Sequence, residues 1–212
     1  MKTMKIIDIS VKVPEAPVYP GDPKTKLLSV SSIKDGDIYN LTEITMSAHA
    51  GTHADAPLHF IDGGSSIDSL SPSKFCGEAR VVTIYKKEGN IEKEDLVPLK
   101  LMKGERILFK TRNSVDGHIT DKEFYKDFCA LSPSAAQYLV DSGVALAGID
   151  YASIGAGGSI AETHRILLSA GIAVLEWLNL EKVCDGNYFL SAAPIKIAAE
   201  GAPARALLFV KD

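Results

Sequence analysis

The sequence predicts an α/β protein built on a mixed sheet with a few covering helices. Segments rich in β-branched and aromatic residues, bounded by Gly, Pro, Asp or Asn, recur along the chain and are typical of strands. Two segments carry helix start and stop signals, and a strand-like segment follows each of them. The chain has 212 residues, of which 46% are hydrophobic, so it can bury one sizeable core. We therefore expect a single domain over residues 1–212.

The expected strands are defined by composition and by the turn residues that flank them. They cover residues 5–13, 39–49, 79–85, 106–112, 144–150, 171–177, 188–197 and 204–210. One helix is expected over 133–142, between Ser132 and Gly143, and another over 160–170, between Ser159 and Gly171.

Charge and composition exclude several classes of partner. The formal net charge is -4 and the basic residues are scattered among acidic ones, so no basic stripe is present to follow a nucleic-acid backbone. No apolar run reaches the roughly 18 residues needed to cross a bilayer, and we expect a cytoplasmic protein without a membrane partner. Cys76, Cys129 and Cys184 form no CxxC pair, which predicts reduced thiols and no thiolate metal site.

The stretch HAGTHADAPLH, residues 49–59, concentrates histidines within eleven positions. On a helix His49 and His53 would share a face, as in zinc proteases, but Gly51 and Pro57 disfavour a helix and the glutamate of HExxH is absent. We therefore expect extended chain over this stretch.

In extended chain the side chains alternate, so His49, His53, Asp55 and His59 would all face one side. A straight strand would hold the first two about 13 Å apart, which is too far for ligands of one ion, so the chain must bend, and Gly51 permits the bend. A single histidine in such a strand is usually a hydrogen-bonded structural residue. Burying several imidazoles and a carboxylate together is costly unless a cation coordinates them, which favours a metal site.

This stretch also resembles a known family motif. HAGTHADAPLHF at 49–60, followed by IDGGSSID, resembles the HxGTHxDxPxHF motif of the cyclase family of metal-dependent hydrolases, whose best-understood members are bacterial kynurenine formamidases (arylformamidases). The resemblance continues in YPGDP at 19–23, LAGIDYASIG at 146–155 and ETHRILLSAGIAVLEWLNL at 162–180. It implies a swivelling β/β/α-type domain around a mixed sheet, assembled as a homodimer or homotetramer.

The resemblance further implies two metal sites that share one carboxylate: His49, His53 and Asp55 at the first, and Asp55, His164 and Glu176 at the second. It implies that His59 is a general acid/base and not a ligand. The N/O ligand set favours zinc, with two ions per chain, although manganese uses similar ligands.

The residues alone leave the second site open. His164 lies early in its expected helix, where it could be a surface or capping histidine, and Glu176 at a strand end could be an ordinary carboxylate. Glu176 nevertheless interrupts an apolar run, where a carboxylate needs a partner, and a reversal at Gly171 could bring the two together. His118 lies in a polar turn-like segment and is expected to be structural.

The expected chemistry is hydrolysis of a small-molecule amide, most simply N-formylkynurenine to kynurenine and formate. A divalent metal lowers the pKa of bound water and polarises a carbonyl, and His59 can transfer the proton to the departing nitrogen. The alternative is a cyclic-amide hydrolase of the isatin hydrolase type, or a related hydrolase of another small amide. His59 argues against a metal-binding protein without activity, and the absence of a GxSxG elbow argues against a nucleophilic hydrolase. The aromatic residues that could line a substrate pocket, or equally belong to the core, are Tyr19, Phe60, Tyr151 and Trp177.

Overall fold

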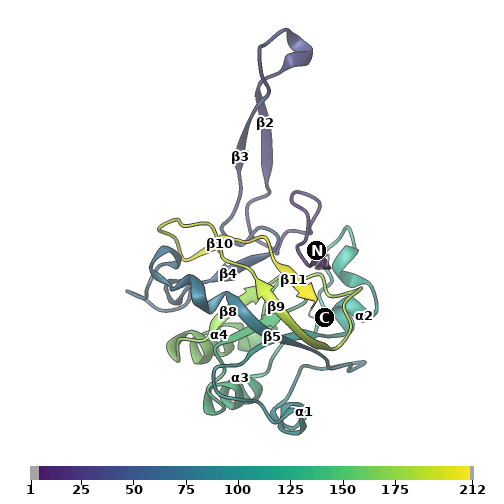
Figure 1. Cartoon of the computed structure of the whole chain (residues 1–212), viewed down its shortest axis with the longest axis vertical. Coiled ribbons are helices and arrows are strands. Elements are labelled where there is room, and N and C mark those ends of the chain that lie inside the picture. Colours follow the sequence, from purple (N-terminus) through teal and green to yellow (C-terminus); the bar gives the residue numbers. More distant parts are fainter. Residues whose placement is uncertain (1–4, 211–212) are drawn as a thin grey trace.

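A mixed nine-stranded sheet is the centre of the computed structural model, which describes residues 5–210 (Figure 1). The strand order is β1-β11-β9-β5-β6-β7-β8-β4-β10. The strands are β1 Ile6–Asp8, β4 His53–Asp55, β5 Cys76–Thr83, β6 Arg106–Lys110, β7 Leu146–Ile149, β8 Ala173–Glu176, β9 Gly186–Ser191, β10 Gly201–Pro203 and β11 Leu207–Val210.

The centre of the sheet is parallel and its flanks are antiparallel. Strands β5 to β8 pair in parallel, β5 pairs antiparallel with β9, and β8 pairs antiparallel with β4. The central strands are covered on both faces, and their sequences are accordingly continuous apolar runs: Ile107, Leu108 and Phe109 of β6 are all buried. The histidine-rich stretch 49–59 therefore passes through β4, which lies beside the parallel centre of the sheet.

Helices cover one face of this sheet. They are α1 Lys93–Leu96, α2 Arg112–Val115, α3 Pro133–Asp141 and α4 Ile160–Ser169. The hydroxyl of Ser132 accepts a hydrogen bond from the backbone N–H of Ala135 at 3.2 Å and caps α3. Gly143 and Gly171 take positive φ values of 69° and 73° just after α3 and α4, where only glycine does so without strain.

Helices α3 and α4 and the mixed sheet confirm the α/β fold expected from the sequence. The observed bounds of α3 and α4 differ from the expected ones by one residue at the C-terminal end. Ser159 stands at the N-cap of α4 as expected, but its hydroxyl donates to the carbonyl of Ala156 and does not cap the helix.

The expected strand at 39–49 is wrong in its second half. Strand β3 ends at Thr45, and the chain turns over residues 48–52. The expectation of extended chain through residue 59 is also wrong, because Pro57–His59 is a 3-10 helix that begins with a proline preset for helical φ. Strand β10 was not expected, since its three residues are too few for a pattern.

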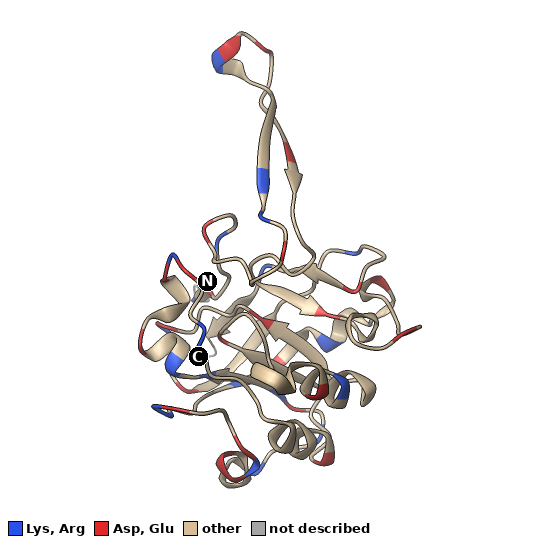
Figure 2. Ribbon diagram, turned by 180° about the vertical axis from the view of Figure 1, so that it is seen from behind, with Lys and Arg blue, Asp and Glu red and all other residues tan. Residues whose placement is uncertain are grey.

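A two-stranded antiparallel hairpin, β2 Lys26–Ser31 and β3 Leu41–Thr45, projects from the body as an arm (Figures 1 and 2). A 3-10 turn at Ile33–Asp35 lies near its tip. We call residues 26–45 the arm.

Two further expectations concern cysteines and membranes. Cys76, Cys129 and Cys184 are all free thiols, as expected. Within residues 5–210, no helix combines the length and the apolar character needed to cross a bilayer.

Candidate metal centre

A sharp turn brings the first two histidines of the motif together. Gly51 has a φ of +63°, and a Cβ at this position would lie 2.5 Å from Cγ2 of Val13. The ring centroids of His49 and His53 are consequently 4.8 Å apart, far closer than a straight strand would hold them. The bend predicted at Gly51 is confirmed.

The pairing of β4 with β8 brings Glu176 next to the histidine-rich stretch 49–59. His53 of β4 and Glu176 of β8 are register partners, and Nε2 of His53 lies 3.4 Å from Oε2 of Glu176. The carboxylate of Asp55 lies between the histidines, with Oδ1 3.0 Å from Nδ1 of His49 and 3.4 Å from Nε2 of His53.

Helix α4 supplies the remaining histidine. Nε2 of His164 lies 3.1 Å from Oε1 of Glu176 and 3.5 Å from Oδ2 of Asp55. The structure therefore brings together all five residues expected to bind metal: His49, His53, Asp55, His164 and Glu176. The reversal at Gly171 is the turn that places α4 beside β8.

Backbone carbonyls fix the orientation of two of these imidazoles. Nδ1 of His53 is 2.8 Å from the carbonyl oxygen of Gly51, and Nδ1 of His164 is 2.7 Å from that of Ile160. Each Nδ1 donates to its carbonyl, so each Nε2 is directed at the carboxylates. This is the arrangement that ordinarily orients a metal-binding histidine.

Several polar atoms of the site are buried without a hydrogen-bond partner. They are Nε2 of His49, Nε2 of His53 and both carboxylate oxygens of Asp55. Buried polar atoms in native proteins are nearly always paired, and leaving them unpaired is costly. A divalent cation ligated by imidazole nitrogens and carboxylate oxygens would satisfy most of them, so these residues fit a metal ion.

The charges of the site balance without an ion. Burial lowers the pKa of His53 and of His164, but the close carboxylates of Asp55 and Glu176 outweigh it and raise each pKa to about 10. Burial raises the pKa of Asp55, but the three imidazoles that lie close to its oxygens hold it well below its usual value. Burial and the charge of Asp55 raise the pKa of Glu176, but hydrogen bonds from His164 and His53 bring it below its usual value.

Two groups of ligand atoms are compact enough to surround an ion. One comprises His49, Asp55 and His59, and the other His53, Asp55 and Glu176, with all ligand atoms of each group within 4.8 Å of one another. Asp55 belongs to both groups, as a bridging carboxylate would. The grouping differs from the expected one because His53 pairs with Glu176 and His59 lies where a ligand could lie.

His59 reaches the site from the 3-10 turn Pro57–His59. Its ring stacks on that of His49, with centroids 4.0 Å apart. Burial lowers the pKa of His59, against the opposing charge of Asp55. Its imidazole is therefore neutral near pH 7 and able to accept a proton.

A cavity of about 170 Å³, open to solvent, lies over these residues. His59, His164 and Glu176 form part of its wall, together with Tyr19 and Phe60. Of the four aromatic residues considered from sequence, these two line the cavity, whereas Tyr151 and Trp177 are buried in the core.

Hydrogen bonds of Thr52 join the chain segments that carry the site residues. Thr52 accepts a hydrogen bond from the backbone N–H of Val11 at 2.8 Å and donates one to the carbonyl of Trp177. Trp177, the residue after Glu176, has a φ of +54°, an unusual conformation for a bulky residue. The hydrogen bonds of Thr52 tie the chain around His53 to the chain around Glu176.

Two acidic residues near the site, Glu200 and Asp22, are not predicted by the sequence analysis. Oε1 of Glu200 lies 3.5 Å from Nε2 of His49, and Asp22 lines the cavity. Gly201 follows Glu200 and pairs with Asp55, and a Cβ on Gly201 would lie 2.8 Å from Cε1 of His49. Only the pairing of β10 with β4 brings Glu200 here, and no local pattern marks it.

His118 contributes to a different cluster. Its Nδ1 lies 2.9 Å from Oδ2 of Asp121, and its ring stacks on Tyr125 with centroids 3.7 Å apart.

Comparison with known proteins is consistent with this site. The model of the family described as "Putative cyclase" matches residues 7–156. A kynurenine formamidase of Delftia acidovorans is 34% identical over 209 residues, covering 97% of this chain and 98% of that protein. A kynurenine formamidase of Salinibacter ruber is 36% identical over 209 residues, covering 97% of each.

Solved structures show the same fold. One described as a potential metal-dependent hydrolase with cyclase activity has a TM-score of 0.86 and 33% identity, covering 99% of this chain and 100% of that chain. Isatin hydrolase A of Labrenzia aggregata has a TM-score of 0.81 at 23% identity, covering 99% of this chain and 94% of that chain, which shows a shared fold. The fold, the motif and these similarities agree, and the chain belongs to the cyclase family.

Proposed function

We propose that this chain is a metal-dependent amide hydrolase, and specifically an arylformamidase that cleaves N-formylkynurenine to kynurenine and formate. The observation that carries the proposal is the cluster of buried, unpaired imidazole and carboxylate atoms at the base of an open cavity. The two similar kynurenine formamidases support the choice of reaction.

The proposed metal ligands are His49, His53 and Asp55 for one ion and Asp55, His164 and Glu176 for a second. The mixture of nitrogen and oxygen donors favours zinc, and two ions per chain are proposed because Asp55 offers two oxygens, both unpaired. A divalent ion held there lowers the pKa of a coordinated water and polarises a carbonyl oxygen.

His59 is the proposed proton-transfer residue. Hydrolysis breaks the C–N bond of the formamide, adds the oxygen of water to the formyl carbon and leaves a proton on the aryl nitrogen. The neutral imidazole of His59 lines the cavity, so it can accept a proton from the attacking water and return it to the departing amine.

The cavity wall provides the contacts for an aryl substrate. Phe60 and Tyr19 expose ring surface to it, and Phe60 stacks on His164 with centroids 4.3 Å apart. An aryl ring held against these side chains could present its formamide group to His49, His164 and Glu176, which line the same cavity.

Steady-state kinetics on purified, zinc-loaded protein test this proposal. N-formylkynurenine and isatin are compared as substrates, with Asp55→Asn as a matched control for contaminating hydrolases. A higher kcat/KM for N-formylkynurenine, lost in the control variant, is the expected result. A preference for isatin, or activity that persists in Asp55→Asn, would contradict the arylformamidase assignment.

A further inference from the structure

The imidazole of His49 lies between two carboxylates, one on each ring nitrogen. Nδ1 lies 3.0 Å from Oδ1 of Asp55, and Nε2 lies 3.5 Å from Oε1 of Glu200. The two histidines His53 and His164 are held the other way round, because their Nδ1 atoms face backbone carbonyls and their Nε2 atoms face the site carboxylates. His49 is therefore reversed, and its Nδ1 is the nitrogen directed at the site.

The spacing of His49 and Asp55 suits two ligands of one ion. Two ligand atoms of a tetrahedral zinc ion are roughly 3.3 Å apart, since each is about 2.0 Å from the metal. The separation of 3.0 Å between Nδ1 and Oδ1 is close to this value, yet Oδ1 has no hydrogen-bond partner. A neutral imidazole that ligates through Nδ1 carries its proton on Nε2, so Nε2 becomes a donor that an ion on Nδ1 does not satisfy.

Nε2 of His49 has only one charged acceptor beside it among residues 5–210, the carboxylate of Glu200. This nitrogen is buried and has no hydrogen-bond partner, which is costly for a donor. Metal-binding histidines ordinarily donate their second N–H to a carboxylate, a carbonyl or a water. The side chain of Glu200 is 43% exposed and forms no other ion pair within the described residues, so it is available for this role.

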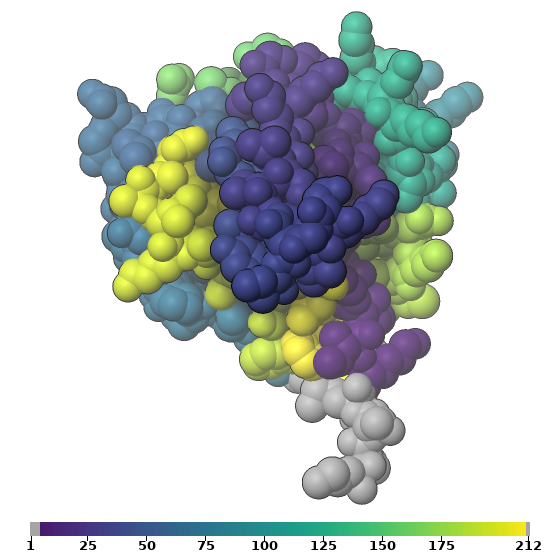
Figure 3. Space-filling model, turned by 90° about the horizontal axis from the view of Figure 1, so that it is seen from above, coloured from purple at the N-terminus to yellow at the C-terminus, as the bar shows by residue number. Residues whose placement is uncertain are grey.

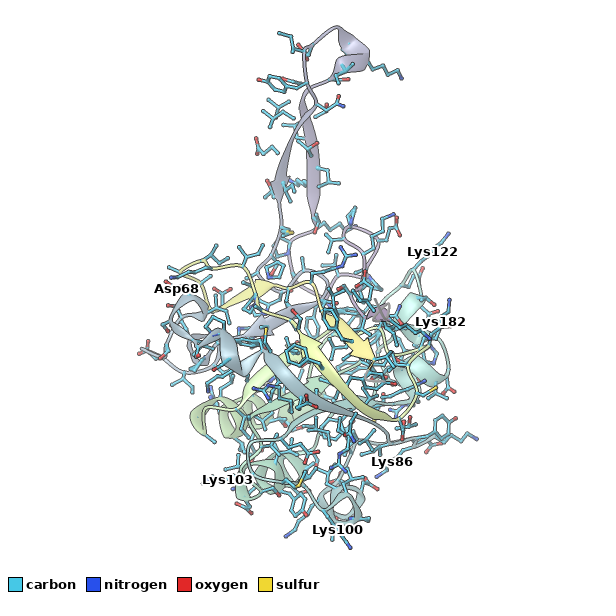
Figure 4. The ribbon with its side chains drawn as sticks, in the orientation of Figure 1. Asp68, Lys86, Lys100, Lys103, Lys122 and Lys182 are labelled. Atoms are coloured by element: carbon cyan, nitrogen blue, oxygen red, sulfur yellow. The ribbon has the colours of Figure 1, made fainter. Side chains whose placement is uncertain are left out.

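The backbone of Glu200 is fixed in this position by neighbouring segments. Its carbonyl accepts a hydrogen bond from the N–H of Ala56 at 2.8 Å, and the carbonyl of Ala199 accepts one from the N–H of Ile67 at 2.9 Å. Figure 4 labels Asp68, the residue after Ile67, beside the loop that leads to β10. Figure 3 shows this loop, in yellow, at the surface beside the arm, so the carboxylate is anchored at its base and reached by water.

Glu200 lies on the side of His49 away from the cavity. His49 is among the residues that line the cavity, whereas Glu200 is not. A carboxylate in this position contacts the ligand residue and not the substrate, so its effect must pass through the orientation of the ring.

We propose that Glu200 is a positioning residue for the first metal ion, and that its carboxylate accepts a hydrogen bond from Nε2 of His49. This bond fixes the ring with Nδ1 toward Asp55 and makes the imidazole a stronger ligand. The second ion is proposed to bind His164 and Glu176 and does not use His49, so loss of Glu200 should affect the first ion selectively. The inference rests on the metal site of the proposed function and not on the amide that is cleaved.

Zinc affinity is measured by competition with a chelator in a Glu176→Ala background, which isolates the first ion. Adding Glu200→Ala should weaken zinc binding by about 10- to 100-fold, as loss of a supporting carboxylate does. Adding Glu200→Gln should give an intermediate affinity, because the amide oxygen still accepts the hydrogen bond but carries no charge. The matched control is Glu181→Ala, an exposed glutamate in the loop after β8, which should leave the affinity unchanged.

Urea unfolding of the metal-free variants separates positioning from a general loss of structure. Because Glu200 is 43% exposed, Glu200→Ala should unfold at the same urea concentration as Glu181→Ala. A fall in zinc affinity that is matched by a lower urea midpoint would show a structural role and overturn the proposal.

Long-range ¹H–¹⁵N NMR of the zinc-loaded wild type reads the protonated nitrogen of each imidazole. His49 should carry its proton on Nε2, whereas His53 and His164 should carry theirs on Nδ1. Equal zinc affinities in the Glu200→Ala and Glu181→Ala variants, or a His49 protonated on Nδ1, overturns the proposal. A wild type that binds zinc but does not hydrolyse N-formylkynurenine would refute the proposed reaction and leave these measurements intact.

Discussion

His53 and Glu176 are register partners on antiparallel strands, and Nε2 of His53 lies 3.4 Å from Oε2 of Glu176. They are far apart in the sequence, and the pairing of β4 with β8 makes them neighbours. Because β8 also pairs with the parallel core, the position of Glu176 is set by the rigid centre of the sheet. The site thus depends on strand register, and a shift of one residue would turn Glu176 to the other face.

The role of His59 is tested by removing its imidazole. His59→Ala should lower kcat by roughly 10²- to 10⁴-fold, the range typical of a general acid/base, while the metal content stays near that of wild type. Kinetics and elemental analysis of the same preparation measure both. His118→Ala is the matched control, since that histidine contacts Asp121 and Tyr125 and should leave both values unchanged. Loss of metal together with activity would make His59 a ligand, the role that its closeness to His49 and Asp55 permits.

Gly201 is predicted to set the position of His49. A methyl group on Gly201 would meet Cε1 of His49 at 2.8 Å and the carbonyl of Ala54 at 3.0 Å, so one of these must move. Gly201→Ala should weaken metal binding by about 10- to 100-fold, as displacement of a supporting contact does at metal sites. Gly158→Ala is the control, because a Cβ there meets nothing within 4 Å. Equal metal affinities in the two variants, measured by competition with a chelator, would show that His49 is free to shift.

Metal binding is predicted to release protons. His53 and His164 have pKa values raised to about 10, so both are protonated near pH 7 in the metal-free chain. An imidazole must lose its proton from Nε2 to ligate through that atom, so each ion replaces one proton, the first that of His53 and the second that of His164. The apparent affinity for each ion should therefore rise between about pH 6 and pH 8, by up to roughly tenfold per pH unit. Calorimetry in buffers of different ionisation enthalpy counts the protons, and an affinity independent of pH would contradict this prediction.

The same pKa values predict the stability of the metal-free chain. A histidine with a raised pKa contributes stability that is fully present below its unfolded value of about 6.5 and is lost as the pH rises through about 10. The free energy of unfolding of metal-free protein should consequently fall as the pH rises from about 6.5 to about 10, whereas that of metal-loaded protein should not. Urea unfolding of both forms at about pH 6 and pH 9 measures the difference, and parallel pH profiles would count against it.

Much of the fold and of the site could be predicted from local sequence. The sequences of α3 and α4 each place a serine at the N-cap position and a glycine just after the last turn, and α3 also begins with Pro133. These signals act within one turn of chain, although only Ser132 caps its helix through its hydroxyl. The bend at Gly51 followed from a geometric requirement, because two ligands of one ion cannot be 13 Å apart.

Other features depend on contacts between distant segments. Glu200 reaches His49 only because β10 adds to the edge of β4, and β10 is a strand of three residues. Residues 57–59 alternate in polarity as a strand would, yet Pro57 begins a 3-10 turn, and local alternation does not distinguish the two. Of the two strands of the arm, β3 has a strand composition that the sequence analysis predicts. Strand β2 is exposed and mixes polar with apolar residues, so local composition does not predict it.

The metal content of wild type, Glu176→Ala and Asp55→Ala tests the central proposal, a site in which one carboxylate serves two ions. Asp55 offers both oxygens, whereas Glu176 is proposed to hold only the second ion. Elemental analysis after saturation with zinc and removal of loosely bound metal should find about two ions per chain in wild type, about one in Glu176→Ala and fewer than one in Asp55→Ala. A wild-type content of one ion that is unchanged in Glu176→Ala would contradict the two-metal site.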